Sequence, residues 1–261
     1  MPDTTQGLAI VGPGLIGTSV ALAAQRRWPG LKVHTVDKGD ALSKIGNSLV
    51  VVLSAPVDVI LEAIAQLPRV IQPGALVIDT ASTKREIMAA AAQAEIQHFV
   101  GGHPMAGGTT IADARADLFD GRAWFLTNPD SPQAVRRATT FVEALGAKPV
   151  VLPDRGEEHD RLMAAVSHLP QVTATMLMAV VARAVGEDNL HWAGSGLRDS
   201  TRLAASQAAV WQSVLASNRR ELRPLLKSLA SELASFADRL QDPEAVRKLF
   251  DEANRAKESC K

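Results

Sequence analysis

A glycine-rich turn between a predicted strand and a predicted helix limits the fold of this chain more than any other feature. The turn reads GPGLIG at residues 12–17, directly after the apolar run Leu8–Val11. In that context Gly12 allows a tight turn, Gly14 lets the backbone approach a pyrophosphate, and Gly17 lets the helix pack closely on a sheet. Glycine-rich turns also occur in unrelated doubly wound folds, but this placement favours a dinucleotide-binding site.

Further residues of the expected cofactor site follow from the same plan. Leu15 and Ile16 open the helix, where unpaired N–H groups and a partial positive charge attract phosphates. Asp37 lies about 20 residues after the turn, where a carboxylate accepts hydrogen bonds from the ribose hydroxyls and repels a 2′-phosphate. This favours NAD as the cofactor, although the adjacent Lys38 leaves NADP possible.

Short apolar runs alternate with amphipathic stretches as far as residue 152, which is the pattern of repeated strand and helix units. We therefore expect an α/β fold, with a Rossmann-like, doubly wound parallel sheet over residues 1–152. Residues 38–47 leave room for a loop or a single turn but not for a full crossover helix. Ser54 and Pro56 end the central strand, at the edge where such sheets bind ligands, and are expected to line the cofactor channel. The expected strands are 8–11, 31–36, 49–53, 76–78, 98–100, 123–126 and 149–151, and the expected helices are 15–27, 57–67, 84–94 and 132–145.

The strand pattern stops after Pro153, and residues 153–261 are expected to form an all-helical domain. Two apolar stripes with helical spacing each need a partner, and Pro170 and Pro224 within them predict kinks or joints. The second stripe is the stronger candidate for a contact between subunits, as a hypothesis, although such stripes more often form core within one chain. The first stripe is Leu162, Val166, Leu169, Thr173, Met176 and Val180, and the second is Leu222, Leu226, Leu229, Leu233, Phe236 and Leu240.

The charge balance argues against nucleic acid as a partner, because 28 Asp and Glu residues match 28 Lys and Arg residues. The apolar stretch at residues 169–182 is shorter than the roughly 20 residues of a membrane-spanning helix, so no membrane is expected. No basic segment precedes the first apolar run, so we expect no secretory signal and a cytoplasmic protein. The single cysteine, Cys260, cannot form a disulfide within the chain. No metal site is expected, because metal-ligand spacing is lacking among His34, His98, His159 and His191.

His103 is the first candidate for chemistry. It lies in the run GGHPMAGG at residues 101–108, just past an expected strand, and the flanking glycines let a ligand come close. An imidazole with a pKa of ~6.5 can accept a proton from a substrate hydroxyl near neutral pH, which hydride removal from an alcohol carbon requires. The alternative is a loop histidine that makes a structural hydrogen bond.

Ser82 is a second candidate at the same edge of the sheet. It lies within DTASTK at residues 79–84, between an expected strand and an expected helix. A serine or threonine in that place usually caps the helix, and Thr83 and Glu86 have the spacing of a capping box. From the residues alone, capping is the simpler explanation of Ser82.

The helical half contains further candidates. His168 lies in the apolar segment SHLP, where a histidine is more often a satisfied core residue. Residues 194–202 bring together glycines, hydroxyls that include Ser195, and two arginines. Arginine binds a carboxylate through two hydrogen bonds, but one of Arg198 and Arg202 is expected to pair with an acid of the chain. GxSxG, HExxH and P-loop motifs are lacking, so hydrolase, zinc protease and NTPase functions lose support.

Taken together, these segments resemble the prephenate/arogenate (cyclohexadienyl) dehydrogenase family. The resemblance covers nearly the whole chain in the order of the family's motifs, and the histidine and arginine motifs are far more specific than the glycine turn. The matching motifs are GPGLIGTS at 12–19, Ser82, GGHPMAG at 101–107, SHLP at 167–170, GSGLRDSTRLA at 194–204, Trp211 and Asn218.

The resemblance implies an oxidative decarboxylation in tyrosine biosynthesis, in which NAD accepts a hydride, carbon dioxide leaves and the ring becomes aromatic. It implies that His103 takes the proton of the ring hydroxyl, while Ser82 orients His103 or that hydroxyl. It also implies a homodimer formed by the helical domain. The residues implied to contact the substrate are Arg202 through a carboxylate, His168, and less directly Ser195 and Trp211.

Some positions depart from the family pattern and leave the substrate open. Gln171 follows SHLP where many members have a histidine, and GTT at residues 108–110 replaces a polar or acidic continuation. Prephenate and arogenate therefore both remain as substrates. Two other functions also remain, namely a different NAD(P)-dependent hydroxyacid dehydrogenase and a dinucleotide-binding sensor without turnover.

Overall fold

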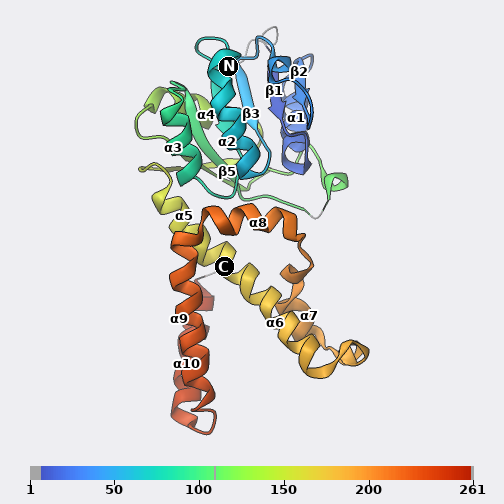
Figure 1. Ribbon diagram of the computed structural model, residues 1–261, viewed down its shortest axis with the longest axis vertical. Coiled ribbons are helices and arrows are strands. Elements are labelled where there is room, and N and C mark those ends of the chain that lie inside the picture. Colours follow the sequence, from blue (N-terminus) through green and yellow to red (C-terminus); the bar gives the residue numbers. More distant parts are fainter. Residues whose placement is uncertain (1–6, 109, 260–261) are drawn as a thin grey trace.

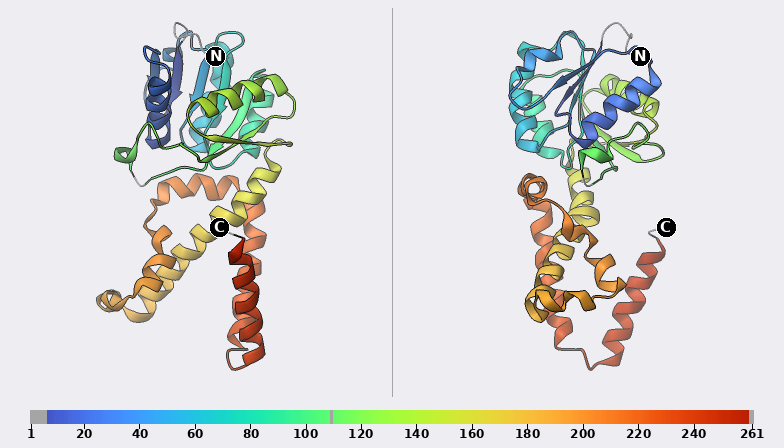
Figure 2. Two further views of the ribbon diagram at one scale, coloured as in Figure 1. Left: turned by 180° about the vertical axis from the view of Figure 1, so that it is seen from behind. Right: turned by 90° about the vertical axis from the view of Figure 1, so that its right-hand side faces the viewer.

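An α/β unit is followed by an elongated set of helices that extends away from it in this computed structural model, as the views of Figures 1 and 2 show. The structure describes residues 7–108 and 110–259. Cys260, for which we predict no disulfide, lies outside the described residues. The predicted fold class, a Rossmann-like unit with a helical C-terminal part, is confirmed.

In the described part of the chain, seven strands form one sheet in the order β2-β1-β3-β4-β5-β6-β7. The sheet is mostly parallel, as predicted, but β6 runs antiparallel to β5, and β7 is parallel to β6. In the described residues of the connection from β5 to β6, the short η3 (Ile111–Asp113) is the only helix, and a chain without a crossover helix returns antiparallel. The strands are β1 (Leu8–Val11), β2 (Val33–Val36), β3 (Val50–Leu53), β4 (Leu76–Asp79), β5 (Phe99–Pro104), β6 (Ala123–Thr127) and β7 (Lys148–Leu152).

Helices cover both faces of the sheet, and each face has its own apolar core. Two helices, α1 (Leu15–Arg27) and α4 (Pro132–Ala144), pack on one face. The other face is covered by α2 (Val57–Gln66) and α3 (Arg85–Gln93). The central strands β1, β3 and β4 are buried throughout, which explains their continuous apolar sequences. The single turn predicted between β2 and β3 is η1 (Leu42–Ile45).

The helical part begins with a helix that leaves the α/β unit, and its later helices return toward that unit. Figure 1 shows α8 lying directly below the α/β unit, with α9 leading away from it and α10 turning back. The elements are α5 (Glu157–Met163), η4 (Ala164–His168), α6 (Leu169–Val185), η5 (Glu187–Trp192), α7 (Ser195–Ser200), η6 (Arg202–Ala205), α8 (Ala208–Ser217), α9 (Arg219–Ala237) and α10 (Pro243–Glu258).

The two apolar stripes are only partly covered within one chain. Leu222 is buried, but Met176 of the first stripe and Leu233 and Leu240 of the second are each about 60% exposed (59%, 61% and 65%). Exposed apolar side chains at helical spacing on neighbouring elements indicate a surface that binds another protein surface.

A π-helical turn interrupts the first long helix close to the proline that predicts a kink or joint. The turn is η4, and Pro170 follows it as the second residue of α6. Proline has no N–H to donate and its ring crowds the preceding turn, so a wider turn is favourable here. By contrast, α9 contains Pro224 within one continuous helix, so the predicted joint does not occur there.

Together α5, η4 and α6 span 29 residues, Glu157–Val185, which is twice the length of the apolar stretch considered in the sequence analysis. An 18-residue window of this helix has a mean hydropathy of 1.4 and is 22% buried, so by length and composition it could cross a membrane. The helix is therefore longer than the apolar stretch at residues 169–182 predicts. A single helix of this kind is weak support for a membrane span, because helices of protein cores and subunit contacts have the same composition.

Candidate active site

The three glycines of the turn after β1 have different surroundings. Gly12 has a φ of +89°, and a Cβ there would overlap the carbonyl oxygen of Ser54. A Cβ on Gly17 would come within 2.8 Å of Cγ2 of Ile10. A Cβ on Gly14 would meet nothing within 4 Å. Gly12 and Gly17 are therefore required by the fold itself, whereas Gly14 leaves space open at the surface.

The amino end of α1 is available to an anion. Gly14 is the N-cap residue and has no side chain to accept the first amides, and the first turn holds no acidic residue. The backbone N–H groups of Leu15 and Ile16 are thus among the unpaired donors of this helix end. Open space at Gly14 and free donors beside it fit the diphosphate of a dinucleotide.

An acidic residue occupies the place next to this turn where a ribose is expected. Asp37 follows β2, and its Oδ1 accepts the amide of Lys38 at 2.7 Å. Asp40 accepts the amide of Asp37 at 3.0 Å and forms an ion pair with Lys44. The Asp37 carboxylate is therefore fixed at the end of β2, and the charge of Lys44 is compensated by Asp40.

The ends of β3 and β4 continue the same edge of the sheet. The Thr80 hydroxyl, after β4, donates to the Ser54 hydroxyl, after β3, at 3.0 Å. Pro56 is the N-cap residue of α2, two positions beyond Ser54. Ser54 lies beside the glycine turn, since a Cβ on Gly12 would overlap its carbonyl oxygen. That Ser54 and Pro56 line a cofactor channel stays a prediction.

A buried ion pair supports the part of the edge that carries His103. Lys84 and Asp79 are 1% and 0% exposed and form an ion pair. The Asp79 carboxylate also accepts the amides of Ala81 at 2.9 Å and Gly102 at 3.0 Å. Burial raises the pKa of Asp79 and lowers the pKa of Lys84, against their mutual attraction. Through Gly102, this pair fixes the backbone directly before His103.

His103 does not stand alone, because a second histidine contacts it. Its Nδ1 lies 2.9 Å from Nε2 of His159, and Nδ1 of His159 lies 2.9 Å from Oδ1 of Asp160. His159 is fully buried. Burial is the main cause that holds the pKa of His103 well below 6.5, and burial also lowers the pKa of His159. Both imidazoles are therefore neutral at pH 7.

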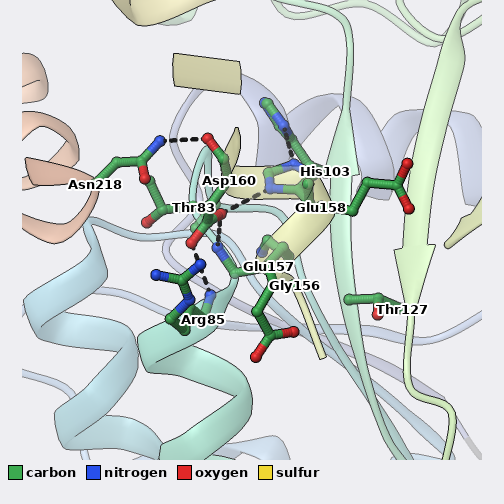
Figure 3. A network of polar contacts seen from close by, with 12 residues as sticks. Thr83, Arg85, His103, Thr127, Gly156, Glu157, Glu158, Asp160 and Asn218 are labelled. Carbon is green, nitrogen blue, oxygen red and sulfur yellow. Dashed lines mark hydrogen bonds and ion pairs between the residues drawn. The ribbon is translucent and has the colours of Figure 1, made fainter. Parts of the chain in front are cut away.

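Asp160 joins the helical part to the α/β unit (Figure 3). Its carboxylate accepts the amides of Lys84 at 2.7 Å and Arg85 at 3.0 Å, at the start of α3. Burial acts to raise the pKa of Asp160, but hydrogen bonds from His159 and these amides hold it below its usual value. The predicted capping box is wrong, because the Thr83 hydroxyl lies 2.9 Å from the Ser217 hydroxyl instead of capping α3.

His168 forms a neighbouring part of the site. Asn218 Nδ2 lies 2.8 Å from the backbone oxygen of Asp160 and 3.0 Å from Nδ1 of His168. The Trp211 ring meets the His168 ring edge-on, with 5.8 Å between the centroids. Burial lowers the pKa of His168 to about 4. His168 is therefore neutral, with Nδ1 as an acceptor and Nε2–H as a donor.

The remaining predicted residues lie apart from these contacts. Ser82 is half-buried between β4 and α3, and no side chain hydroxyl caps α3. Ser195 is the first residue of α7 and is exposed. Among the residues that the structure describes, neither Arg198 nor Arg202 forms an ion pair, so the predicted pairing of one of them does not occur. The Arg202 guanidinium is exposed at the start of η6.

Three residues of the site are not predicted by any sequence motif. They are His159, which lacks the spacing of a metal ligand, Asp160 and Lys84. The signal that could have found the first two is an adjacent histidine and aspartate at the start of the helical part, close before the SHLP segment. Within residues 7–108 and 110–259, no group of three His, Cys, Asp or Glu side chains is placed to hold a metal ion.

An open glycine turn at the carboxyl edge of a Rossmann-like sheet, with a half-buried neutral histidine on the same edge, defines a dinucleotide-dependent oxidoreductase. Comparison with known families makes the class specific. The model "Prephenate dehydrogenase, nucleotide-binding domain" matches residues 16–151, and "Prephenate dehydrogenase, dimerization domain" matches residues 155–252. The chain belongs to the prephenate dehydrogenase family.

Individual relatives agree with this assignment. Prephenate dehydrogenase of Lactococcus lactis is 29% identical over 97% of this chain and 77% of its own length. The crystal structure of Synechocystis arogenate dehydrogenase has a TM-score of 0.80 and 27% identity, and the match covers 98% of this chain and 100% of that one. Prephenate dehydrogenase of Aquifex aeolicus, solved with hydroxyphenyl propionate and NAD+, shares the fold with a TM-score of 0.86 at 22% identity over 97% and 98% of the two chains.

Proposed function

We propose that this protein catalyses the oxidative decarboxylation of prephenate or arogenate, with hydride transfer to NAD. The observation that carries the proposal is His103, a half-buried neutral imidazole on the ligand-binding edge of the sheet, in a chain of the prephenate dehydrogenase family. A neutral imidazole can accept the proton of the ring hydroxyl, and Ser82, after the neighbouring strand, orients His103 or that hydroxyl. Loss of carbon dioxide then makes the ring aromatic.

The substrate is held by residues of the helical part. Arg202 has no ion-pair partner among the described residues, so its guanidinium is available to bind a carboxylate through two hydrogen bonds. His168 offers Nε2–H to a substrate oxygen, and Trp211 packs against its ring. Ser195 contacts the substrate less directly. The domains are residues 1–152 for the cofactor and 153–261 for the substrate and the dimer.

The cofactor is held by the glycine turn and its neighbours. Gly14 admits the diphosphate, Gly12 and Gly17 give the turn its shape, and the amides of Leu15 and Ile16 donate to the phosphates. Ser54 and Pro56 line the channel toward the nicotinamide, which accepts the hydride when the cofactor is bound.

NAD is preferred over NADP because of Asp37. Its carboxylate is fixed beside the turn and repels a 2′-phosphate, while the adjacent Lys38 keeps NADP as a second candidate cofactor. Asp37→Asn keeps the shape and removes the charge, so kcat/KM with NADP should rise relative to NAD. An unchanged ratio of kcat/KM for NADP and NAD would mean that the ribose 2′-hydroxyl of the cofactor does not lie at Asp37.

The test of the reaction is the formation of NADH or NADPH with prephenate and arogenate in turn. His103→Ala should lower kcat by about 100 to 10,000-fold without changing NAD affinity. His98→Ala is the matched control, because His98 lies in the turn directly before β5, at the end of that strand far from His103, and this variant should keep its turnover. Full turnover by His103→Ala would refute the assignment of the base, and no turnover by the wild-type protein would favour another hydroxy acid or a sensor.

We also propose that the protein is a cytoplasmic homodimer formed by the helical part. The exposed apolar side chains of α6 and α9 need a cover, and the second family model is described as a dimerization domain. Light scattering should give twice the chain mass. Met176→Glu, on α6, should release monomers, while Val59→Glu, at an exposed position of α2, should leave the dimer intact.

A further inference from the structure

A chain of hydrogen bonds starts at the catalytic candidate His103 and ends in the helical part. His103 Nδ1 and His159 Nε2 are 2.9 Å apart, and His159 Nδ1 and Asp160 Oδ1 are 2.9 Å apart. His159 and Asp160 are 0% and 2% exposed, so water does not compete for these bonds. Figure 3 shows Asp160 and His103 in this network, with Asn218 on the far side of Asp160.

The proton positions along this series of hydrogen bonds follow from the carboxylate at its end, Asp160. The Asp160 carboxylate is ionised, because backbone amides of α3 and His159 hold its pKa down, and an ionised carboxylate only accepts. His159 must therefore donate from Nδ1. Since His159 is neutral, its Nε2 is an acceptor, and His103 must donate to it from Nδ1. Nε2 of His103 is then left without a proton and is free to act as the base.

We infer that His159 and Asp160 are positioning residues of the dehydrogenase, which hold His103 in its Nδ1–H form and share the proton that it receives. The inference deepens the proposed function and rests on it. In the step, the O–H bond of the substrate breaks and an Nε2–H bond forms on His103, while the hydride leaves for the cofactor. The Nδ1 proton of His103 moves toward His159 Nε2, so the positive charge comes to lie beside the Asp160 carboxylate.

The other charged groups around His103 make this assistance necessary. Burial is the main cause that disfavours a positive charge on His103, and His159, Lys84 and His168 disfavour it further; Lys84 is itself paired with Asp79. Asp160 is the carboxylate that contacts His159, and it is held at both oxygens by the amides of Lys84 and Arg85. Asp79 also favours a positive charge on His159, and Lys84 disfavours it. The base therefore depends on a carboxylate that both parts of the chain fix in place.

The proton positions can be measured without turnover. Heteronuclear NMR of isotope-labelled histidine rings distinguishes Nδ1–H from Nε2–H, and the chain has only six histidines, so a His103→Asn spectrum assigns the signal. The expected result is His103 protonated at Nδ1 at neutral pH. A wild-type His103 protonated at Nε2 would overturn the inference, even if the enzyme oxidises prephenate.

Two substitutions of His159 separate orientation from charge sharing. His159→Gln places an amide oxygen where Nε2 was, so His103 should stay in its Nδ1–H form but lose its path to Asp160. His159→Phe keeps a ring against Phe125, which contacts His159 at 5.7 Å between centroids, but offers no acceptor. In this variant His103 should revert to Nε2–H.

The kcat and the pH profile of the His159 variants are a second readout, which would not change if His159 had only a structural role. His159→Phe should lower kcat by about 100-fold or more, in the range of lost acid-base help, with little change in KM. His159→Gln should lower kcat less, and its acid limb should move to lower pH, because the protonated His103 loses the carboxylate that stabilises it. An unchanged kcat and pH profile in both variants would refute the inference. If the wild-type protein oxidises neither acid, the proposed function fails, while the NMR result still tests the tautomer.

Discussion

Replacing Gly14 by alanine tests whether the cofactor crosses the glycine turn. The new Cβ would meet no protein atom within 4 Å, and Gly14 has a φ of −74°, which alanine adopts without strain. Stability should therefore change by less than about 1 kcal/mol, as expected for glycine to alanine at a compatible backbone. The methyl group would project into the space through which the diphosphate must approach. Losing one charge-assisted hydrogen bond costs about 1.5–3 kcal/mol, so the Kd for NAD should rise by about 10 to 150-fold.

Gly12→Ala is the matched control, because it should mainly lower stability, whereas Gly14→Ala should mainly lower NAD affinity. A φ of +89° costs a side chain about 1–3 kcal/mol, and overlap with the Ser54 carbonyl adds about 1–3 kcal/mol of overpacking. A loss of about 2–6 kcal/mol is a large part of the stability of an ordinary domain and should lower the Tm by several degrees or more. Calorimetric titration with NAD and thermal denaturation measure the two effects. Wild-type NAD affinity in Gly14→Ala would refute this reading of the turn.

Three further perturbations have expected outcomes. Lys84→Met should lower the free energy of unfolding by about 3–5 kcal/mol in urea denaturation, because it leaves Asp79 buried without its partner. Asp37→Asn, at an exposed position, is the control, and a loss of stability in Lys84→Met smaller than in this control would contradict the prediction. The pKa of His168 is lowered from 6.5 to about 4, so between these values the unfolded chain binds a proton that the native one does not. Stability should thus fall by up to about 3 kcal/mol as the pH drops through this window, and His168→Gln should flatten the fall. Arg202→Ala should raise KM for the substrate about 10 to 100-fold with kcat little changed, and an unaltered KM in initial-rate kinetics would assign the carboxylate to Arg198.

Much of the α/β unit was predictable because its signals are local. Strands buried on both faces read as continuous apolar runs, and the glycine turn marks the junction of β1 and α1 within six residues. The direction of β6 and β7 was not predictable in this way, because an apolar run has the same sequence in a parallel and an antiparallel pair. Only the lack of a crossover helix before β6 indicated that this strand runs antiparallel to β5.

The helical part was harder to interpret because its apolar stripes do not distinguish core from interface. Leu222 and Leu233 occur in the same stripe, yet the first is buried and the second is 61% exposed. Helical spacing says which residues share a face but not what covers that face. The length of the helix Glu157–Val185 was missed for a related reason, since charged residues at its start end an apolar run without ending a helix.

The start of α3 shows why the site could be predicted only in part. Thr83 has the local spacing of a cap, but the α3 amides bind Asp160, which lies 76 and 75 positions away along the chain. An ionised carboxylate is a stronger acceptor than a hydroxyl, so the distant residue is favoured once the fold brings it near. The same carboxylate binds His159, which contacts His103 across 56 positions. The motif around His103 therefore locates the base, whereas its protonation depends on residues of the helical part that no local pattern connects to it.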